Sequence, residues 1–274
     1  MSVHRRRGQR PDGSSGKLLV IGGAESHSEE DDTILERFAT LAGGATARLV
    51  VIATASESPA DREKEYQAVF EGLGVAEAVP LRLEHRDQAN SDHAVAALER
   101  ATGVFFTGGD QLRITPVLGG SRADLTLHAR LAEGLVLAGT SAGAAMMSST
   151  MILSGQDAAV STASVRTGPG MEFLPGVLID MHFAERGRLN RLLSAIAMFP
   201  HELGLGIDEN TAILVDGDDF EVLGAGSVTV IDAGLATAIR APIENDGPIA
   251  LCGVQLHVLP AGYHFDLAER RPRD

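Results

Sequence analysis

Five short apolar runs, each ended by small or polar residues, alternate with helix-like segments in the first half of the chain. The runs are KLLVIGG (17–23), ARLVVIATAS (47–56), AEAVPLRL (76–83), TGVFFTGG (102–109) and GLVLAGTS (134–141). The helix-like segments between them are 31–42, 59–73, 91–100 and 122–132. Near-continuous apolar strands that alternate with helices are typical of a parallel sheet covered on both faces. The sequence therefore predicts an α/β fold with a mostly parallel sheet sandwiched by helices.

The second half of the chain follows a different pattern. Residues 155–176 resemble a long loop, 185–199 a helix, and 211–234 hairpin strands that turn at 216–219. No linker-like stretch separates the halves, so residues 17–274 are predicted to form one α/β domain with a C-terminal β-hairpin region. Residues 1–16 are basic and predicted to be a disordered tail.

Composition narrows the classes of function. No apolar stretch approaches the ~20 residues of a membrane helix, and a net charge of −14 argues against non-specific nucleic-acid binding. The charge would favour a cationic ligand, although solubility is its more common explanation. The single Cys252 excludes a disulfide framework and a multi-cysteine metal site, which fits a cytoplasmic protein. No set of residues with ligand spacing predicts a metal or an organic cofactor.

A candidate nucleophile follows the fifth run, where Gly139-Thr140-Ser141-Ala142-Gly143 matches the Gly-x-Ser-x-Gly elbow. In such a strained strand-to-helix turn the hydroxyl is exposed, and side chains at the flanking positions would collide with neighbouring backbone. The amide of Ala142 would begin a helix, where it suits an oxyanion. The alternative is that small residues only let a helix pack closely on a strand.

A serine nucleophile needs a base, and His182 is the candidate because it closes an apolar run before an arginine-rich helix. It could instead be a buried structural histidine. The carboxylate that would orient it is Asp208 or Glu209, at the end of another short apolar run. The order serine, histidine, acid differs from that of α/β-hydrolases, chymotrypsin and subtilisin, so an ordinary esterase fits poorly.

Five blocks, VIGGAE, FFTGGDQLRI, GTSAGAAMM, MHFAERGRLNRL and GIDENTA, lie in this order between about residues 17 and 230. Together they resemble cyanophycinase, a serine peptidase of the aspartyl dipeptidase group. The resemblance implies a flavodoxin-like fold related to class I glutamine amidotransferases, a Ser-His-Glu triad and a homodimer. It also implies exo-cleavage of cyanophycin, a poly-aspartate that carries arginine on its β-carboxyls, to β-Asp-Arg dipeptides.

By this resemblance the triad falls on Ser141, His182 and Glu209, and the oxyanion donors are the amides of Ala142 and Gly109. The remaining family pocket residues fall on Gln111, Asp180, Arg186, Arg188 and Arg191. Arginines three apart share a helix face, and a guanidinium can hold an aspartyl carboxylate through two hydrogen bonds. An acidic residue such as Asp180 could receive the substrate's arginine. Without the resemblance, the arginines could equally form a solvated basic face.

One position departs from the family pattern. The residue before the histidine is usually glutamine, whereas this chain has Met181, which cannot donate a hydrogen bond. Specificity shifted toward β-Asp-Lys or another isopeptide is therefore open. Two rival functions also fit the sequence: a dipeptidase for α-aspartyl peptides on the same fold, and a catalytically inactive peptide-binding protein.

Overall fold

A nine-stranded sheet lies at the centre of the computed structural model, which describes residues 16–25, 33–155, 159–240 and 247–273. The predicted tail, apart from Gly16, lies outside the described residues. All five predicted runs form strands that pair in parallel: β1 (Leu18–Ile21), β2 (Arg48–Ile52), β3 (Glu77–Pro80), β4 (Gly103–Phe106) and β5 (Val136–Thr140). Their spatial order is β1-β5-β4-β2-β3. This parallel half of the sheet confirms the mixed α/β prediction.

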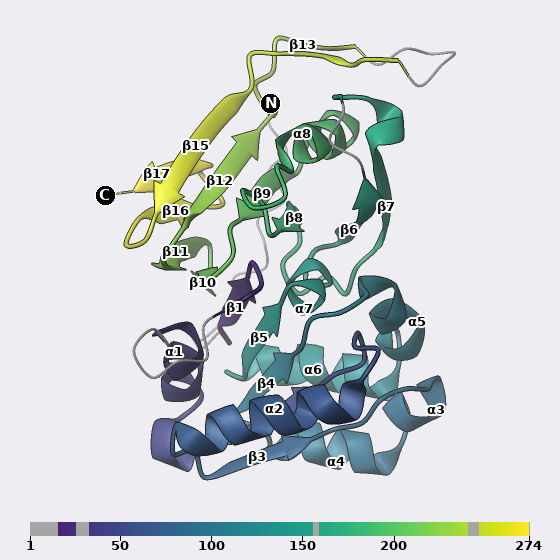
Figure 1. Ribbon diagram of the computed structural model, residues 1–274, viewed down its shortest axis with the longest axis vertical. Helices are drawn as coiled ribbons and strands as arrows, with labels where there is room; N and C mark the ends of the chain where they lie inside the picture. The colour runs from purple at the N-terminus through teal and green to yellow at the C-terminus, as the bar shows by residue number, and fades with distance from the viewer. Residues whose placement is uncertain (1–15, 26–32, 156–158, 241–246, 274) are drawn as a thin grey trace.

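The four helices predicted from the first half of the chain are also present. They are α1 (Thr33–Leu41), α2 (Pro59–Gly72), α4 (Asp92–Arg100) and α6 (Arg122–Ala132), joined by the short α3 (Arg86–Ala89) and α5 (Ile114–Leu118). Helix α2 crosses one face of the strands and α4 and α6 lie on the other (Figure 1). Alternation along each strand separates the two cores, because Leu19 and Phe105 pack with α1 and α2, whereas Leu18 and Phe106 pack with α4 and α6. Both faces of the parallel strands are therefore covered, as predicted.

Antiparallel strands extend the sheet beyond β1. The predicted hairpin is formed by β10 (Thr211–Asp216) and β11 (Asp219–Gly224), with Asp216 opposite Asp219. Strands β16 (His264–Asp266) and β17 (Arg271–Arg273) complete the edge. Strand β10 pairs directly with β1, so the residues that precede β10 reach the carboxyl end of the parallel strands.

A second sheet has the order β15-β12-β9-β8 and comprises β8 (Val177–Met181), β9 (Leu203–Ile207), β12 (Ser227–Asp232) and β15 (Gln255–Pro260). Helix α8 (Leu189–Met198) packs against it (Figure 1). Two further pairs are β6 (Thr150–Gly155) with β7 (Val165–Pro169), and β13 (Ala238–Arg240) with β14 (Ala250–Cys252).

Two predictions for the second half need correction. The long loop expected over 155–176 contains strand β7, because its backbone pairs with β6, while residues 156–158 lie outside the described ranges. The helix expected from residue 185 begins only at Leu189, because Gly187 has φ of +60° and the preceding residues form turns.

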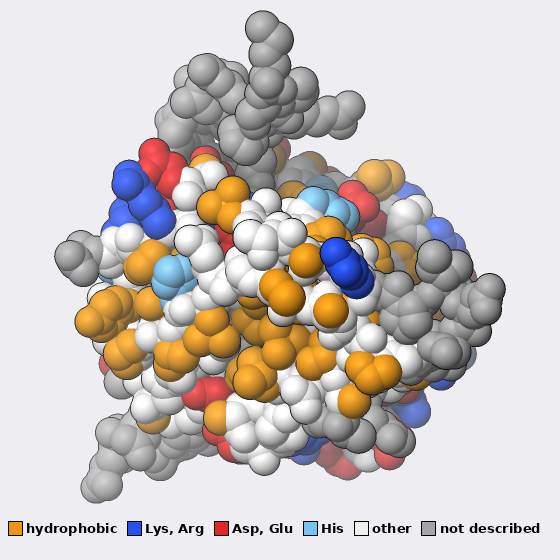
Figure 2. Space-filling model, turned by 90° about the horizontal axis from the view of Figure 1, so that it is seen from above, with side chains coloured by type: hydrophobic (Ala, Val, Ile, Leu, Met, Phe, Trp, Pro, Cys, Tyr) orange, Lys and Arg blue, Asp and Glu red, His pale blue; other side chains and the backbone are white. Residues whose placement is uncertain are grey.

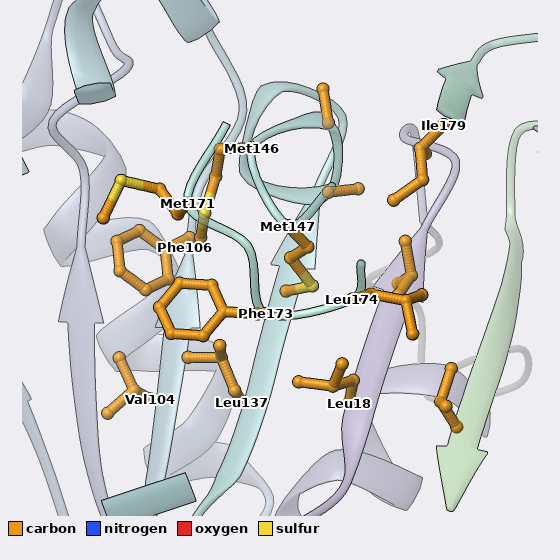
Figure 3. Close-up of a cluster of buried hydrophobic side chains, with 14 of the residues drawn as sticks. Leu18, Val104, Phe106, Leu137, Met146, Met147, Met171, Phe173, Leu174 and Ile179 are labelled. Carbon is orange, nitrogen blue, oxygen red and sulfur yellow. The ribbon is translucent and has the colours of Figure 1, made fainter. Parts of the chain in front are cut away.

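The turn after β5 rests on a dense apolar core (Figure 3). The short helix α7 (Ala142–Ala145) leads into Met146 and Met147, both fully buried. They meet Phe106 and Leu137 from the sheet and the buried segment that holds Phe173. The packing of Met146 and Met147 therefore fixes α7 relative to β5. None of the helices in the described ranges is long and apolar enough to cross a membrane.

Candidate active site

Ser141 occupies a strained turn between β5 and α7. Its φ of 51° and ψ of −109° lie in a region that non-glycine residues rarely adopt. The flanking glycines are required by close backbone contacts. A Cβ on Gly139 would lie 2.3 Å from the carbonyl oxygen of Gly143, and one on Gly143 would lie 2.4 Å from that of Phe106. The structure therefore gives this segment the geometry of a nucleophile elbow.

Two backbone segments lie beside this serine. Ala142 is the first residue of α7, so its amide has no partner within the helix. Across from it, a Cβ on Gly108 would lie 3.4 Å from the Cβ of Ser141. Gly109 has φ of +146°, and a side chain there would collide with the Ala55 carbonyl oxygen at 2.1 Å. The loop after β4 thus lies beside the serine at Gly108 and needs glycine at position 109 because of the Ala55 carbonyl.

The imidazole of His182 links the serine to a carboxylate. Its Nε2 lies 2.9 Å from Ser141 Oγ, and its Nδ1 lies 2.6 Å from Glu209 Oε1. His182 also has a positive φ, of 49°, and its amide donates to the Gly22 carbonyl at 2.9 Å. A Cβ on Gly23 would lie only 2.3 Å from imidazole Cε1. The loop after β1 therefore packs directly against the imidazole ring at Gly23.

The structure distinguishes the two adjacent acids. Glu209 contacts His182, whereas Asp208 accepts hydrogen bonds from the Ala184 amide at 3.1 Å and from the amide and hydroxyl of Ser227 at 3.0 and 2.9 Å. With Glu209 ionised, Nδ1 of His182 carries the proton and Nε2 is left to accept from the serine hydroxyl. Asp208 instead holds together the turns that follow β8 and β9.

A cavity of about 780 Å³ opens beside Ser141 and His182, between the sheet edge and the start of α2. Four carboxylates line it: Glu25, Glu57, Glu65 and Asp110. Arg62 is the only lysine or arginine among the described lining residues, and its Nη1 lies 2.6 Å from Glu65 Oε2. The charged side chains of this wall are therefore predominantly acidic, which the sequence alone did not indicate.

Glu25 is the most buried of these acids, at 7% exposure. It follows β1 and accepts hydrogen bonds from the Tyr66 hydroxyl, at 2.5 Å, and from the Thr140 hydroxyl. Burial, reinforced by the neighbouring charge of Glu25, raises the pKa of Tyr66 above its ordinary value. The sequence did carry one signal for Glu25, which is an acid at the carboxyl end of a predicted parallel strand.

The family pocket residues around β8 lie elsewhere. Asp180 is fully buried, and Arg191 binds it through two hydrogen bonds, one of them from Nε at 2.9 Å. Arg188 approaches the same carboxylate at 3.5 Å and donates to the Met181 carbonyl. Arg191 thus already pairs with Asp180, the acid that could receive the substrate's arginine.

The other two pocket residues differ in exposure. Gln111 donates its side-chain amide to the carbonyls of Ile152 and Leu153 at 2.8 and 3.0 Å. Arg186 is exposed in the turn before α8. Neither residue lines the 780 Å³ cavity, nor do Asp180, Arg188 and Arg191. Within the described ranges, no three His, Cys, Asp or Glu side chains gather so as to hold a metal ion.

Comparison with known proteins identifies relatives of this chain. Over 266 residues the chain is 38% identical to the cyanophycinase of Nostoc sp. (strain PCC 7120), covering 95% of this chain and 88% of that protein. It is 35% identical to the cyanophycinase of Geminocystis herdmanii over 261 residues, which is 93% of this chain and 95% of the relative. A crystal structure of a peptidase from an acI-B1 actinobacterium shares the fold, with a TM-score of 0.66 and 21% identity over 93% of this chain and 98% of the other. Residues 18–223 match the model of peptidase family S51, and the chain belongs to that family.

Proposed function

We propose that this chain is a serine exopeptidase that hydrolyses cyanophycin to β-Asp-Arg dipeptides. The relatives named cyanophycinase support the substrate. The observation that carries the proposal is the unbroken contact from Ser141 through His182 to Glu209, at 2.9 and 2.6 Å, beside a cavity large enough for a dipeptide unit.

In this mechanism the Ser141 Oγ attacks the scissile carbonyl while its proton passes to Nε2 of His182. The amides of Ala142 and Gly109 stabilise the oxyanion of the tetrahedral intermediate. His182 then protonates the leaving amine, and a water, deprotonated by the same imidazole, hydrolyses the acyl-enzyme. Glu209 holds the Nδ1–H tautomer and stabilises the imidazolium as it forms.

For recognition of the peptide, we retain the family set Gln111, Asp180, Arg186, Arg188 and Arg191 as the proposed specificity residues, with divided roles. The exposed Arg186 is free of recorded side-chain contacts in the described structure and is proposed to bind a substrate carboxylate directly. The pair of Asp180 and Arg191 is proposed to position Arg188.

Three features of the whole molecule complete the proposal: a class I glutamine amidotransferase-like fold, a single domain over residues 17–274, and a cytoplasmic homodimer. Buried side chains from the central sheet and the second sheet share one apolar cluster, which supports a single domain. The face in Figure 2 carries hydrophobic side chains across its middle and few charged ones, which supports an interface between two copies.

The test is mass spectrometry of digests of cyanophycin that contains both arginine and lysine, compared with digestion of α-aspartyl dipeptides. The wild-type protein should release β-Asp-Arg. Ser141→Ala should reduce turnover by a factor on the order of 10⁴ to 10⁶, because triad members act as a unit. A fluorophosphonate should label wild-type Ser141.

Several outcomes would contradict the proposal. Release of α-aspartyl products alone would favour a dipeptidase, and an unlabelled Ser141 would favour an inactive peptide-binding protein. Activity of Ser141→Ala within about tenfold of wild type would exclude the serine mechanism, since loss of a nucleophile costs far more.

A further inference from the structure

The acidic cavity beside Ser141 has a net negative wall. Its four lining carboxylates face a single described lining cation, Arg62, which already pairs with Glu65. Arg113 lies 3.8 Å from Glu57 but does not line the cavity. The space next to the reacting hydroxyl therefore has more carboxylates than cations.

Glu25 is the informative member of this wall. It is 7% exposed, and its recorded contacts in the described structure are two neutral hydroxyls, of Tyr66 and Thr140, with no ion pair. Burying a carboxylate is costly unless it is paired, and neutral hydrogen bonds offset only part of that cost. Each carboxylate oxygen accepts more than one hydrogen bond, so both still have acceptor capacity.

We propose that this cavity, with Glu25 as its most buried acid, is a subsite for the guanidinium of a substrate's basic side chain. The inference rests on the proposed peptidase function and assigns residues to recognition of the cation. A guanidinium supplies planar donors that match carboxylates and is more weakly hydrated than an ammonium, so arginine should be favoured over lysine. The chain's net charge of −14 would further attract a cationic substrate.

The proposed subsite lies directly beside the nucleophile. Thr140, which hydrogen-bonds Glu25, immediately precedes Ser141, and both line the same cavity. A basic side chain held here would place its peptide within reach of the nucleophile. The subsite lies on the side of α2, whereas Asp180 and its two arginines lie on the side of α8.

The experiment measures binding in the Ser141→Ala background, where no turnover complicates it. Calorimetry compares a short β-Asp-Arg oligopeptide with the same peptide carrying citrulline, which replaces the guanidinium by a neutral urea of similar shape. The arginine peptide should bind at least about tenfold more tightly, as expected for loss of a charge-assisted pair. Adding Glu25→Gln should reduce that preference to within about threefold.

Two further variants make the result specific. Glu71→Gln also removes one negative charge, but from an exposed position on α2 outside the cavity, where Glu71 pairs with Gln67. This variant should keep the full preference for the arginine peptide. Glu57→Gln alters the exposed rim of the cavity, so it should fold normally and reduce the preference by about twofold.

Equal affinity for the two peptides, or no detectable binding of either, would overturn the subsite. So would an undiminished preference in both Glu25→Gln and Glu57→Gln, and the Glu57 variant alone decides the matter if Glu25→Gln does not fold. Hydrolysis by the wild-type protein is scored separately. A preference for arginine that depends on Glu25, in a protein that cleaves no β-aspartyl peptide, would support the subsite and contradict the proposed function.

Discussion

Buried carboxylates flank the Ser141–His182 pair on two sides, and they differ in what they contact. On the side of α8, Asp180 is fully buried and bound by Arg191, with Arg188 nearby. On the side of α2, Glu25 is almost as deeply buried, but within the described residues its side chain accepts hydrogen bonds only from hydroxyls. A carboxylate whose counter-ion comes from the protein contributes to structure, whereas one that lacks it retains the capacity to bind a cationic ligand.

The difference follows from chain topology. Asp180 lies on β8 and Arg191 on α8, and the short connection between them folds the helix back onto its own strand. Glu25 follows β1, Thr140 ends β5 and Tyr66 lies on α2, and the three side chains come together at the carboxyl edge of the sheet. This edge is where open α/β sheets bind ligands.

Among the effects that test this comparison, the largest separates chemistry from recognition. Glu209→Gln should lower kcat by roughly 10³- to 10⁴-fold, because the amide no longer fixes the productive tautomer of His182. The loss should be equal for arginine and citrulline peptides, since Glu209 lies in neither flank. Steady-state kinetics on both peptides measures it.

Asp208→Asn provides the matched control for this prediction. Asp208 accepts three hydrogen bonds from Ala184 and Ser227, so this variant should lose stability more than rate. If Asp208→Asn were the slower enzyme, the orienting role would pass to Asp208.

The next largest effect tests whether the ion pair of Asp180 and Arg191 stabilises the fold. Arg191→Ala leaves Asp180 buried with its bidentate partner removed, which should destabilise the protein by about 3–5 kcal/mol. At this chain length that corresponds to a fall in Tm of roughly 10 °C by calorimetry.

Arg186→Ala is the control for Arg191→Ala, because Arg186 is exposed and should leave Tm within about 1 °C. A Tm unchanged in Arg191→Ala would mean that the arginine is available to substrate, and the contrast between the two flanks would fail.

The sequence predicted the parallel half of the fold well because buried strands leave a strong local signal. The five apolar runs end where β1 to β5 end, within a few residues. It failed over 155–176, where β7 forms only because β6 lies opposite and no periodicity marks it. Pairing between segments is a tertiary effect that local pattern does not report.

The candidate site shows the same limit. Gly139 could be interpreted from sequence because its close contact, with Gly143, lies within one turn, whereas the contact of Gly143 with Phe106 on β4 could not. The choice between Asp208 and Glu209 came from family resemblance, and the structure pairs Glu209 with His182. The partners of Glu25 were not predictable, because Tyr66 is 41 residues away and Thr140 is 115 residues away. The pairing of Asp180 with Arg191 was likewise not predictable, because it depends on how α8 folds back onto β8.

The smallest expected effect concerns Tyr66 and tests whether the α2 side is dry and acidic. Burial first, and then the charge of Glu25, raise the pKa of Tyr66, so its phenol should stay protonated in the folded protein well above the ordinary value of about 10. Because the folded state holds this proton more tightly than the unfolded state, the stability it contributes is complete below pH of about 10 and is lost as pH rises further. The chain has two tyrosines and no tryptophan, so near-ultraviolet phenolate absorbance is easily resolved.

At pH of about 11 the folded wild type and Tyr66→Phe should give equal phenolate absorbance, and the wild type should gain one further phenolate only on unfolding in denaturant. Glu25→Gln should lower the pKa of Tyr66 by removing the neighbouring charge, although burial would still keep it raised. An extra phenolate in the folded wild type at that pH would mean that water reaches Tyr66 and Glu25 freely, and the cavity would then lack the sheltered carboxylate on which its preference for a guanidinium depends.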